Sequence, residues 1–293
     1  MPAKPFPIEN LVIFGVGLIG GSFALALKEA CAVRRVIGLG RNPANLKRAL
    51  KLGVIDAMSN DPAAVAGADL VLIATPVGQM GGVMRSIAPH LGARTVVTDG
   101  GSTKQDVVAL ARKHLAKHVA QFVPGHPIAG AEASGVSAAR ADLFVGRKVV
   151  LTPLPENRPA SVRMVRAGWQ ACGARLHRMQ PDEHDRVFAA ISHLPHLLSF
   201  ALVDLVVRHD NARQLFDYAA GGFRDFTRIA SSHPEMWRDI CVANRKALLG
   251  ELTGYQLELA GLKRLLARGD AAGLEKIFVR ARKARDKWLR SQK

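Results

Sequence analysis

Short apolar runs alternate with helix-like segments through the first 180 residues of the chain. Gly, Pro or charged residues bound the runs, and the segments between them are rich in Ala, Leu and Lys. The pattern predicts strands at 11–14, 35–39, 69–75, 94–98, 121–123, 148–152 and 174–179, and helices at 21–32, 43–52 and 104–118. Strands that alternate with helices of about 10–15 residues are typical of a parallel, doubly wound α/β sheet.

The pattern changes after residue 180, because no convincing strand follows. Pro181-Asp182-Glu183 looks like a helix start, with an early proline and acids in the first turn. Helical patterns follow at 184–209 (disturbed near Pro195), 211–219, 234–260 and 271–289. We therefore expect an α/β domain over 1–180 and an all-helical domain over 181–293.

The composition is that of an ordinary globular protein. Its 293 residues are 48% apolar, enough for two domains with cores of their own. We expect the apolar stretches to fall short of the ~20 residues of a membrane span, and the first ten residues lack the apolar core of a signal peptide. The three cysteines stand alone, which argues against a disulfide framework or a cysteine zinc site. A cytoplasmic protein with no membrane contact is expected.

Basic residues are in excess, with a formal net charge of +17. Residues 261–293 alone hold eleven Lys or Arg against three acids, a net of +8. Such a segment can bind nucleic acid. No recognised nucleic-acid motif accompanies it, however, and aromatic residues make up only 5% of the chain. We interpret it as a solvated basic helix and expect no nucleic-acid partner.

A glycine loop, Gly15-Val16-Gly17-Leu18-Ile19-Gly20, follows the first strand and opens a helix. In that context it predicts a Rossmann dinucleotide site. Gly15 permits the tight turn, Gly17 lets the backbone approach a pyrophosphate, and Gly20 lets helix and sheet pack closely. The predicted cofactor-binding residues are Gly15, Gly17, Leu18, Ile19, Gly20, Arg41, Thr75 and Pro76.

The end of the second strand bears on the choice between NAD and NADP. NAD-specific folds place an acid there to bind the ribose 2′-hydroxyl. This chain reads Gly38-Leu39-Gly40-Arg41 instead, without the acid. Arg41 can pair with a 2′-phosphate, stack on adenine, or lie in solvent as an ordinary loop residue. The sequence favours NADP slightly and leaves NAD open.

Four later stretches carry candidate chemistry. Asp99-Gly100-Gly101-Ser102-Thr103-Lys104 and Gly125-His126-Pro127-Ile128-Ala129-Gly130 each follow a strand, at the edge where ligands bind. Ser192-His193-Leu194-Pro195-His196 and a Gly-Gly-Phe-Arg-Asp-Phe-Thr-Arg run over 221–228 lie in the helical half.

Each candidate side chain has an ordinary alternative. A neutral His126 suits the general-base step of hydride transfer from an alcohol. Ser102 can fix the tautomer of that imidazole or cap a helix, and Lys104 either serves the site or lies on a solvated face. Arg228 either clamps a carboxylate in bidentate fashion or pairs with Asp225.

In this order, the glycine loop and these later stretches resemble the prephenate dehydrogenase family, which includes arogenate and cyclohexadienyl dehydrogenases. The resemblance extends over roughly residues 8 to 250. It implies oxidative decarboxylation of prephenate or arogenate to 4-hydroxyphenylpyruvate or tyrosine, with hydride transfer to NAD(P), in tyrosine biosynthesis. It also implies a homodimer formed through the helical domain.

The resemblance assigns roles to individual residues. It implies that His126 is the catalytic base with Ser102 as its hydrogen-bond partner, and that Arg228 holds the ring carboxylate. His196 is similar to the residue that faces the substrate's side chain in the family. Ala131 stands where relatives usually carry a polar residue, so the sequence leaves open the choice between prephenate and arogenate. Glu132, Asp225 and Trp237 are similar to residues that line or gate the site, although a tryptophan in the setting of Trp237 is more often a core residue, and His193 fits a structural role within its helix.

Other functions stay open at this point. A β-hydroxyacid dehydrogenase or imine reductase shares the Rossmann and helical halves but uses a lysine in the helical domain. A dinucleotide-sensing regulator that binds nucleic acid through the basic C-terminus belongs to a different class. His184, His193 and His196 lie only loosely on one helical face, and no HExxH motif is present, so no metal site is expected.

Overall fold

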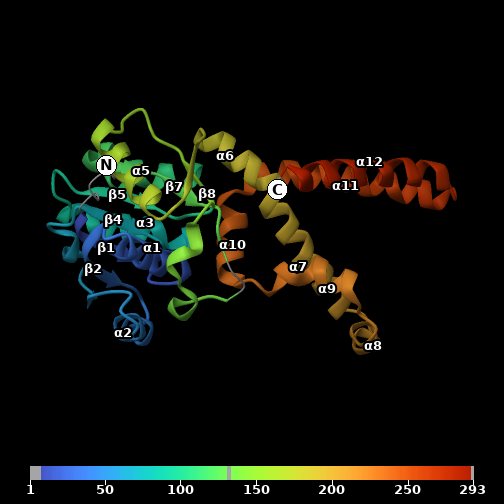
Figure 1. The fold of residues 1–293 in the computed structure, drawn as a ribbon. Coiled ribbons are helices and arrows are strands. Elements are labelled where there is room, and N and C mark those ends of the chain that lie inside the picture. The colour runs from blue at the N-terminus through green and yellow to red at the C-terminus, as the bar shows by residue number, and fades with distance from the viewer. Residues whose placement is uncertain (1–7, 131–132, 292–293) are drawn as a thin grey trace. The chain divides into compact units, whose positions relative to one another are not determined.

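The computed structural model describes residues 8–130 and 133–291. The chain divides into two compact units, Met1–Arg245 and Lys246–Lys293 (Figure 1). The first unit holds every described strand and the helices up to residue 243. The predicted domain boundary at residue 180 therefore falls inside this unit, where the chain passes from α/β to all-helical structure.

A six-stranded parallel sheet forms the centre of the first unit, and this confirms the predicted doubly wound α/β fold. The strand order is β3-β2-β1-β4-β5-β6. In parallel sheets buried on both faces, strands read as continuous apolar runs, which is why the sequence located most of them. The strands are β1 (Ile8–Phe14), β2 (Val33–Leu39), β3 (Ala57–Ser59), β4 (Leu70–Ile73), β5 (Val96–Asp99) and β6 (Phe122–Val123).

The two faces of this sheet carry separate apolar clusters, because successive side chains of a strand point to opposite faces. Leu11 and Ile13 of β1 belong to one cluster and Val12 and Phe14 to the other. One cluster includes residues of α1 and α5, and the other includes residues of α3, α4 and α10. The helices of this α/β part are α1 (Leu18–Glu29), α2 (Pro43–Lys51), α3 (Val77–Ile87), α4 (Gln105–His114) and α5 (Pro159–Ala171).

A second, three-stranded sheet corrects the predicted topology. The predicted strands at 148–152 and 174–179 do not extend the large sheet but pair as β8 (Lys148–Leu151) and β9 (Arg175–Arg178). Their neighbour is β7 (Gly125–Pro127), which runs antiparallel to β8 and places His126 opposite Val150. Pairing partners of a three-residue strand are set by the tertiary structure, so the sequence pattern could not reveal this sheet.

The helical part of the first unit contains two interruptions. The predicted helix at 184–209 consists of α6 (Pro181–Phe188), a π-helical turn (Ala189–His193) and α7 (Leu194–Val207). The predicted helix at 234–260 is broken at Asn244, between α10 (Pro234–Ala243) and α11 (Arg245–Ala267). π-Helical turns occur frequently at functional sites. Two short helices, α8 (Ala212–Asp217) and α9 (Gly221–Thr227), complete this part.

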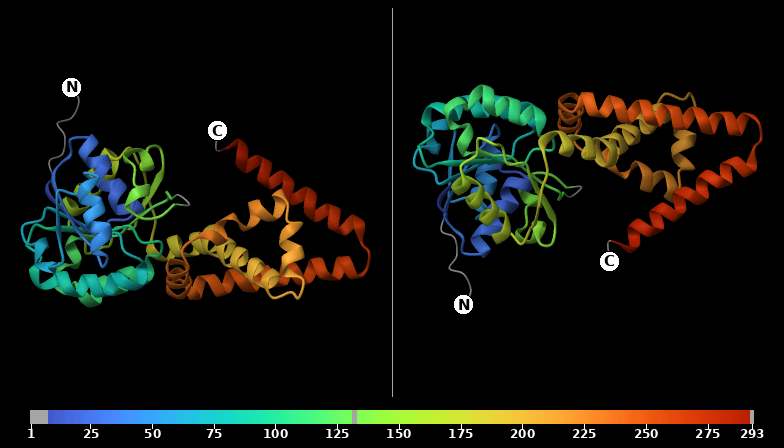
Figure 2. Two further views of the ribbon diagram at one scale, coloured as in Figure 1. Left: turned by 90° about the horizontal axis from the view of Figure 1, so that it is seen from below. Right: turned by 90° about the horizontal axis from the view of Figure 1, so that it is seen from above.

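The second unit consists of most of α11 and all of α12 (Ala271–Arg290), joined by a short turn (Figure 2). Asp270 caps α12 by accepting a hydrogen bond from the Gly273 amide at 2.8 Å. Arg280 Nη2 lies 3.6 Å from Glu258 Oε1 and pairs the two helices. None of the described residues of α12 is buried within this chain.

One helical run is more apolar than the sequence pattern suggested. The continuous helical run Pro181–Val207 contains an 18-residue window with a mean hydropathy of 1.6, so by length and composition alone it could cross a bilayer. Only 17% of its most apolar stretch is buried inside the chain. The run therefore offers an apolar surface that the rest of the chain leaves uncovered.

Candidate functional site

The glycine loop has the shape that a pyrophosphate requires. Gly15 has φ +92°, and a Cβ added there would meet the Ala74 carbonyl oxygen at 2.6 Å. A Cβ at Gly17 would meet nothing within 4 Å, so the space in front of this residue is open. Gly17 is also the N-cap of α1 and makes no side-chain cap. The open backbone amides at this helix start fit an anionic phosphate.

Two further features connect the loop with the rest of the site. Thr75, which follows β4, has a buried hydroxyl with no hydrogen-bond partner among the described residues, as expected of a group that awaits a ligand. A Cβ at Gly100 would lie 3.2 Å from Ile19 Cγ2 and 3.8 Å from Pro127 Cδ. The glycine loop and the His-Pro strand therefore meet across Gly100.

Arg41 lies on the loop after β2, and its side chain is 72% exposed. Its Nη2 is 3.6 Å from Oε1 of Glu235 on α10, and the Gln79 amide donates to the same oxygen at 3.4 Å. An acid is therefore present beside Arg41 after all, although it comes from the helical half and not from the end of β2.

His126 lies in β7 and is only partly exposed. Its Nδ1 is 2.8 Å from His184 Nε2, and His184 Nδ1 is 2.8 Å from Asp185 Oδ1. His184 and Asp185 are buried on α6. Burial and the neighbouring His184, Lys104 and His193 hold the pKa of His126 well below its usual range, so the ring is neutral at pH 7.

A buried ion pair fixes the strand that carries His126. Lys104 Nζ pairs with Asp99 Oδ2, and both side chains are fully buried. Lys104 also donates to the Gly125 carbonyl at 2.7 Å, and the Gly125 amide donates to Asp99 Oδ1 at 3.1 Å. The interpretation of Lys104 as a solvated residue is therefore wrong. The Lys104 side chain is buried and donates a hydrogen bond to Gly125, the residue just before His126.

Ser102 lies close to the buried His193. His193 is close enough to the Ser102 backbone for a hydrogen bond to raise its pKa slightly, while burial, the largest effect, lowers that pKa to about 4. The Asn244 amide lies 3.0 Å from His193 Nδ1 and donates to the Asp185 carbonyl at 2.8 Å. In the described residues, the partner recorded for His126 Nδ1 is His184 and not Ser102.

The helical half contributes a second group around His196. The rings of His196 and Trp237 stack at 3.5 Å with an interplanar angle of 17°. His196 Nδ1 donates to the Ser192 carbonyl at 2.8 Å, so the other ring nitrogen of the neutral residue can accept a hydrogen bond. Burial first, and then nearby Arg228, lowers the pKa of His196. Trp237 packs in the core and also stacks on His196, a candidate site residue.

Asp225 is exposed on α9, with Oδ1 3.9 Å from Arg224 Nε. Glu132 and Ala131 lie outside the described residues. Sequence reasoning considered His184 only as a metal ligand, and it missed the contacts of His184 with His126 and with Asp185. Within the ranges that the structure describes, no group of three or more His, Cys, Asp or Glu side chains is arranged to hold a metal ion.

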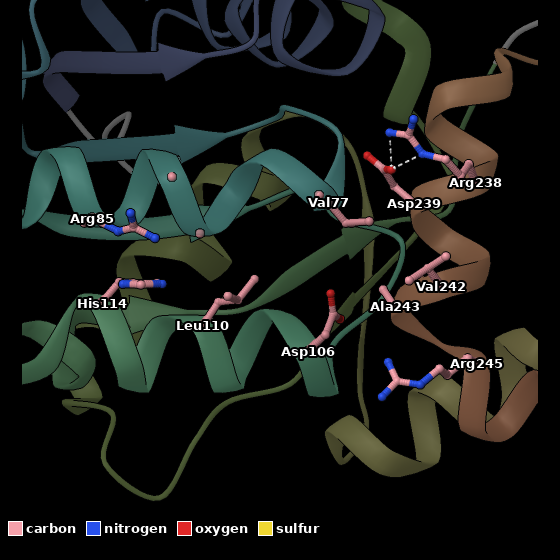
Figure 3. Close-up of a pocket in the computed structure, with 13 residues that line it drawn as sticks. Val77, Arg85, Asp106, Leu110, His114, Arg238, Asp239, Val242, Ala243 and Arg245 are labelled. Carbon is pink, nitrogen blue, oxygen red and sulfur yellow. Dashed lines mark hydrogen bonds and ion pairs between the residues drawn. The ribbon is translucent and has the colours of Figure 1, made fainter.

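A separate pocket of about 440 Å³ lies among α3, α4 and α10 (Figure 3). Arg85 and His114 line one end, and Asp106, Arg245 and the Arg238–Asp239 ion pair line the other. None of the predicted catalytic, substrate-binding or cofactor-binding residues lines it. The site built around His126 is therefore distinct from this pocket.

Comparisons with known proteins identify the family of this chain. Residues 23–178 match the family model of the prephenate dehydrogenase nucleotide-binding domain, and residues 180–280 match that of the prephenate dehydrogenase dimerization domain. Prephenate dehydrogenase of Bacillus subtilis is 39% identical over 95% of this chain and 76% of its own length. Cyclohexadienyl dehydrogenase of Zymomonas mobilis is 35% identical over 94% and 95%.

A solved structure shows the same overall architecture. Prephenate dehydrogenase from Aquifex aeolicus, in complex with hydroxyphenyl propionate and NAD+, superposes with a TM-score of 0.88 at 35% identity. The match covers 96% of this chain and 98% of the other.

Proposed function

The chain belongs to the prephenate dehydrogenase family, and from that premise we propose that it catalyses the oxidative decarboxylation of prephenate or arogenate. The products are 4-hydroxyphenylpyruvate or tyrosine, so the reaction belongs to tyrosine biosynthesis. The observation that carries the proposal is a neutral histidine, hydrogen-bonded on one side, on a strand that meets the dinucleotide loop across Gly100.

We propose that His126 is the general base. The substrate is a ring alcohol with a carboxylate on the opposite ring carbon. His126 takes the hydroxyl proton as the carbinol carbon loses its hydride, for which a bound nicotinamide supplies the acceptor. The carbon–carboxylate bond then breaks, CO2 leaves, and its electron pair makes the ring aromatic. The ring oxygen ends as a phenol, so His126 can return the proton, and the protein mainly orients and neutralises.

Substrate binding falls to the helical half in this proposal. Arg228 holds the ring carboxylate, because a guanidinium matches a carboxylate in bidentate fashion. His196, kept in one orientation by Trp237 and the Ser192 carbonyl, faces the substrate's side chain. Asp225 and Glu132 are proposed to line or gate the entrance, and Ser102 to act beside His126. A keto acid and an amino acid differ in that side chain, so His196 and its neighbours decide between prephenate and arogenate.

The cofactor is a nicotinamide dinucleotide, supported by the nucleotide-binding family model and the open glycine loop. We propose that Arg41 allows NADP to be used, while Glu235 weakens that preference by pairing with Arg41. The values of kcat/KM for both cofactors, in wild type and Arg41→Ala, test this proposal. An equal loss with NAD and NADP would exclude a role at the 2′-phosphate.

We also propose a cytoplasmic homodimer formed through the helical half. The dimerization-domain model matches residues 180–280, and apolar side chains on several helices of that range are largely exposed in a single chain. Size-exclusion chromatography coupled to light scattering should give twice the chain mass of 31.5 kDa. A monomer at micromolar concentration would contradict it. The exposed apolar residues include Leu205, Val207, Val242, Leu249, Leu257, Leu266 and Phe278.

One assay tests the activity itself. The purified chain is given prephenate or arogenate with NAD or NADP, and the absorbance of the reduced nicotinamide is followed over time. At least one of the four combinations should give steady turnover. Absence of turnover in all four, with a folded protein, would refute the proposed function.

A further inference from the structure

A chain of hydrogen bonds runs from His126 into the protein. His126 Nδ1 faces His184 Nε2, and His184 Nδ1 faces Asp185 Oδ1, each at 2.8 Å. The first contact joins residues that lie 58 positions apart, on β7 and α6. Phe188 covers the two imidazoles, with ring centroids 4.9 Å from His126 and 4.5 Å from His184. This arrangement resists movement of the His126 ring.

Asp185 ends the chain as an ionised carboxylate. Its Oδ1 accepts the Lys104 amide at 2.8 Å and its Oδ2 accepts the Gln105 amide at 2.9 Å, so it caps α4 from a neighbouring helix. Burial alone would raise the pKa of this carboxyl. The hydrogen bonds from His184 and the two amides outweigh burial and keep the pKa below its usual value. The positive end of the α4 dipole favours the same charge.

The protonation of both imidazoles follows from that carboxylate. An ionised Asp185 can only accept, so His184 Nδ1 must carry the hydrogen. His184 is neutral because burial lowers its pKa, and its Nε2 is then an acceptor. His126 must therefore donate through Nδ1, which leaves the lone pair on its Nε2. That nitrogen is the one able to take a proton from a substrate.

Other charges around these rings come from three elements. Lys104 and its partner Asp99 lie at the start of α4 and the end of β5, and both act electrostatically on His184. His193 faces the pair from the π-helical turn, and Asp106 faces Asp185 from α4. Asp99 forms an ion pair with Lys104 and so balances its charge. Asp185 is the acid that makes a direct hydrogen bond to the chain of two histidines.

We propose that His184 is a positioning residue that, anchored by Asp185, holds His126 in the Nδ1–H tautomer and stabilises the imidazolium formed when His126 takes the substrate proton. The role in turnover rests on the proposed function; the tautomer itself does not. When Nε2 gains a proton, the Nδ1–H bond to His184 becomes charge-assisted, and Asp185 balances the charge one residue further on. In serine proteases with a Ser-His-Asp triad, a substitution that leaves the histidine in the wrong tautomer lowers kcat by about 10⁴-fold.

Two isosteric variants separate this role from a structural one. In His184→Gln the amide oxygen takes the place of Nε2, so the acceptor for His126 is kept and the Asp185 contact is lost. In His184→Asn the amide nitrogen takes the place of Nδ1, so the donor to Asp185 is kept and His126 loses its acceptor. We expect kcat to fall by less than about 10-fold in His184→Gln and by about 100-fold or more in His184→Asn, with KM for the substrate nearly unchanged.

A structural role predicts the opposite order, because only His184→Asn keeps the α6–α4 connection through Asp185. Equal losses in the two variants, or a greater loss in His184→Gln, would overturn the proposal. The pH profile gives a further readout. Without the acceptor, the imidazolium of His126 is less stable, so the rising limb of kcat against pH should move to lower pH in His184→Asn only.

Nitrogen-15 NMR of the histidine rings tests the tautomer without any turnover. The His126 signals are assigned by their loss in His126→Asn. In wild type, Nδ1 should show the shift of a protonated nitrogen and Nε2 that of an unprotonated one. His184→Asn should shift the population toward the other tautomer. Protonated Nε2 in neutral wild-type protein would overturn the proposal, even if the enzyme is active. If wild type fails to turn over either substrate, the proposed function fails, and these spectra still decide the tautomer.

Discussion

The two halves of the first unit complete their cores to very different degrees. All four residues of β4 and all four of β5 are buried, and both faces of the sheet are covered by helices. In the 14-residue helix α7, only Leu194 and Ser199 are buried, although the helix is among the most apolar in the chain. A parallel sheet buries both faces within one chain, whereas these helices leave apolar faces for another surface.

This difference matches the division of roles that we propose for the site. The rigid sheet half presents His126 on a strand held by a buried ion pair. The more open helical half presents His196, Trp237 and Arg228 on helices with exposed surfaces. We expect substitutions in the sheet half to act mainly on the chemical step, and those in the helical half mainly on substrate binding.

The largest effect is expected at the base itself. In His126→Asn the amide nitrogen can still donate to His184, so the fold is kept while the base is lost. General-base removal costs about 10²- to 10⁴-fold, so kcat should fall by that factor with little change in substrate affinity. Steady-state kinetics together with equilibrium substrate binding measure both quantities. A variant with near wild-type kcat would show that the base lies elsewhere.

The counterpart in the helical half is Arg228→Ala. Hydrogen bonds to charged groups contribute about 1.5–3 kcal/mol each, so KM should rise roughly 10- to 100-fold while kcat changes little. Arg228→Lys, which keeps the charge but loses the bidentate geometry, should give an intermediate KM. A fall in kcat at constant KM would instead place Arg228 in the chemical step and break the proposed division between the halves.

Stability should differ between the halves in the same way. Lys104→Met leaves Asp99 buried without its cation, which costs about 3–5 kcal/mol. The matched control is Arg186→Met, which breaks an exposed i,i+4 pair with Asp182 (2.7 Å) and should cost less than about 1 kcal/mol. Urea unfolding at one fixed protein concentration measures both variants. Comparable losses would mean that the Asp99–Lys104 pair adds nothing beyond a surface ion pair.

Acid should weaken the junction between the halves through His193. Burial lowers the pKa of His193 to about 4, so between about pH 6.5 and 4 the unfolded chain binds more protons than the folded one. The free energy of unfolding must therefore fall as pH falls through this range, by up to about 3 kcal/mol from this residue. In His193→Asn the side-chain oxygen can still accept from Asn244. This variant should flatten the pH dependence, and an unchanged slope would contradict the assignment.

The sequence predicted the sheet half better than the helical half, for a physical reason. Buried parallel strands are continuous apolar runs, so β1, β2, β4 and β5 lie within three residues of their predicted positions. Helix α3 was missed because its glycines disfavour a helix. The structure shows their purpose, since added Cβ atoms at Gly78 and Gly81 would collide with Asp239 and Leu110. These glycines let α10 and α4 approach α3.

Site residues that belong to a local sequence motif could be predicted. Contacts between segments that are distant in the sequence could not. His126 and the glycine loop stand in recognisable local patterns, so their positions could be inferred. His184 is 58 residues from His126, and Asp185 caps a helix 80 residues earlier in the chain. No local pattern records such contacts. The buried state of Lys104 was missed for the same reason, because its partners Asp99 and Gly125 converge only in the folded sheet.

The smallest effect is expected where the two halves touch at the proposed binding site of the cofactor's ribose. Arg41 comes from the sheet half and Glu235 from the helical half, with 3.6 Å between Nη2 and Oε1. Glu235→Gln removes a charge that competes with a 2′-phosphate for Arg41, so kcat/KM with NADP relative to NAD should rise by about 1.5- to 5-fold, which corresponds to the free energy of an exposed ion pair. The same substitution in an Arg41→Ala background should leave the ratio unchanged, since the cation is gone. If the NADP/NAD ratio of kcat/KM still rises without Arg41, Glu235 repels the 2′-phosphate directly. The helical half would then discriminate between the two cofactors without Arg41.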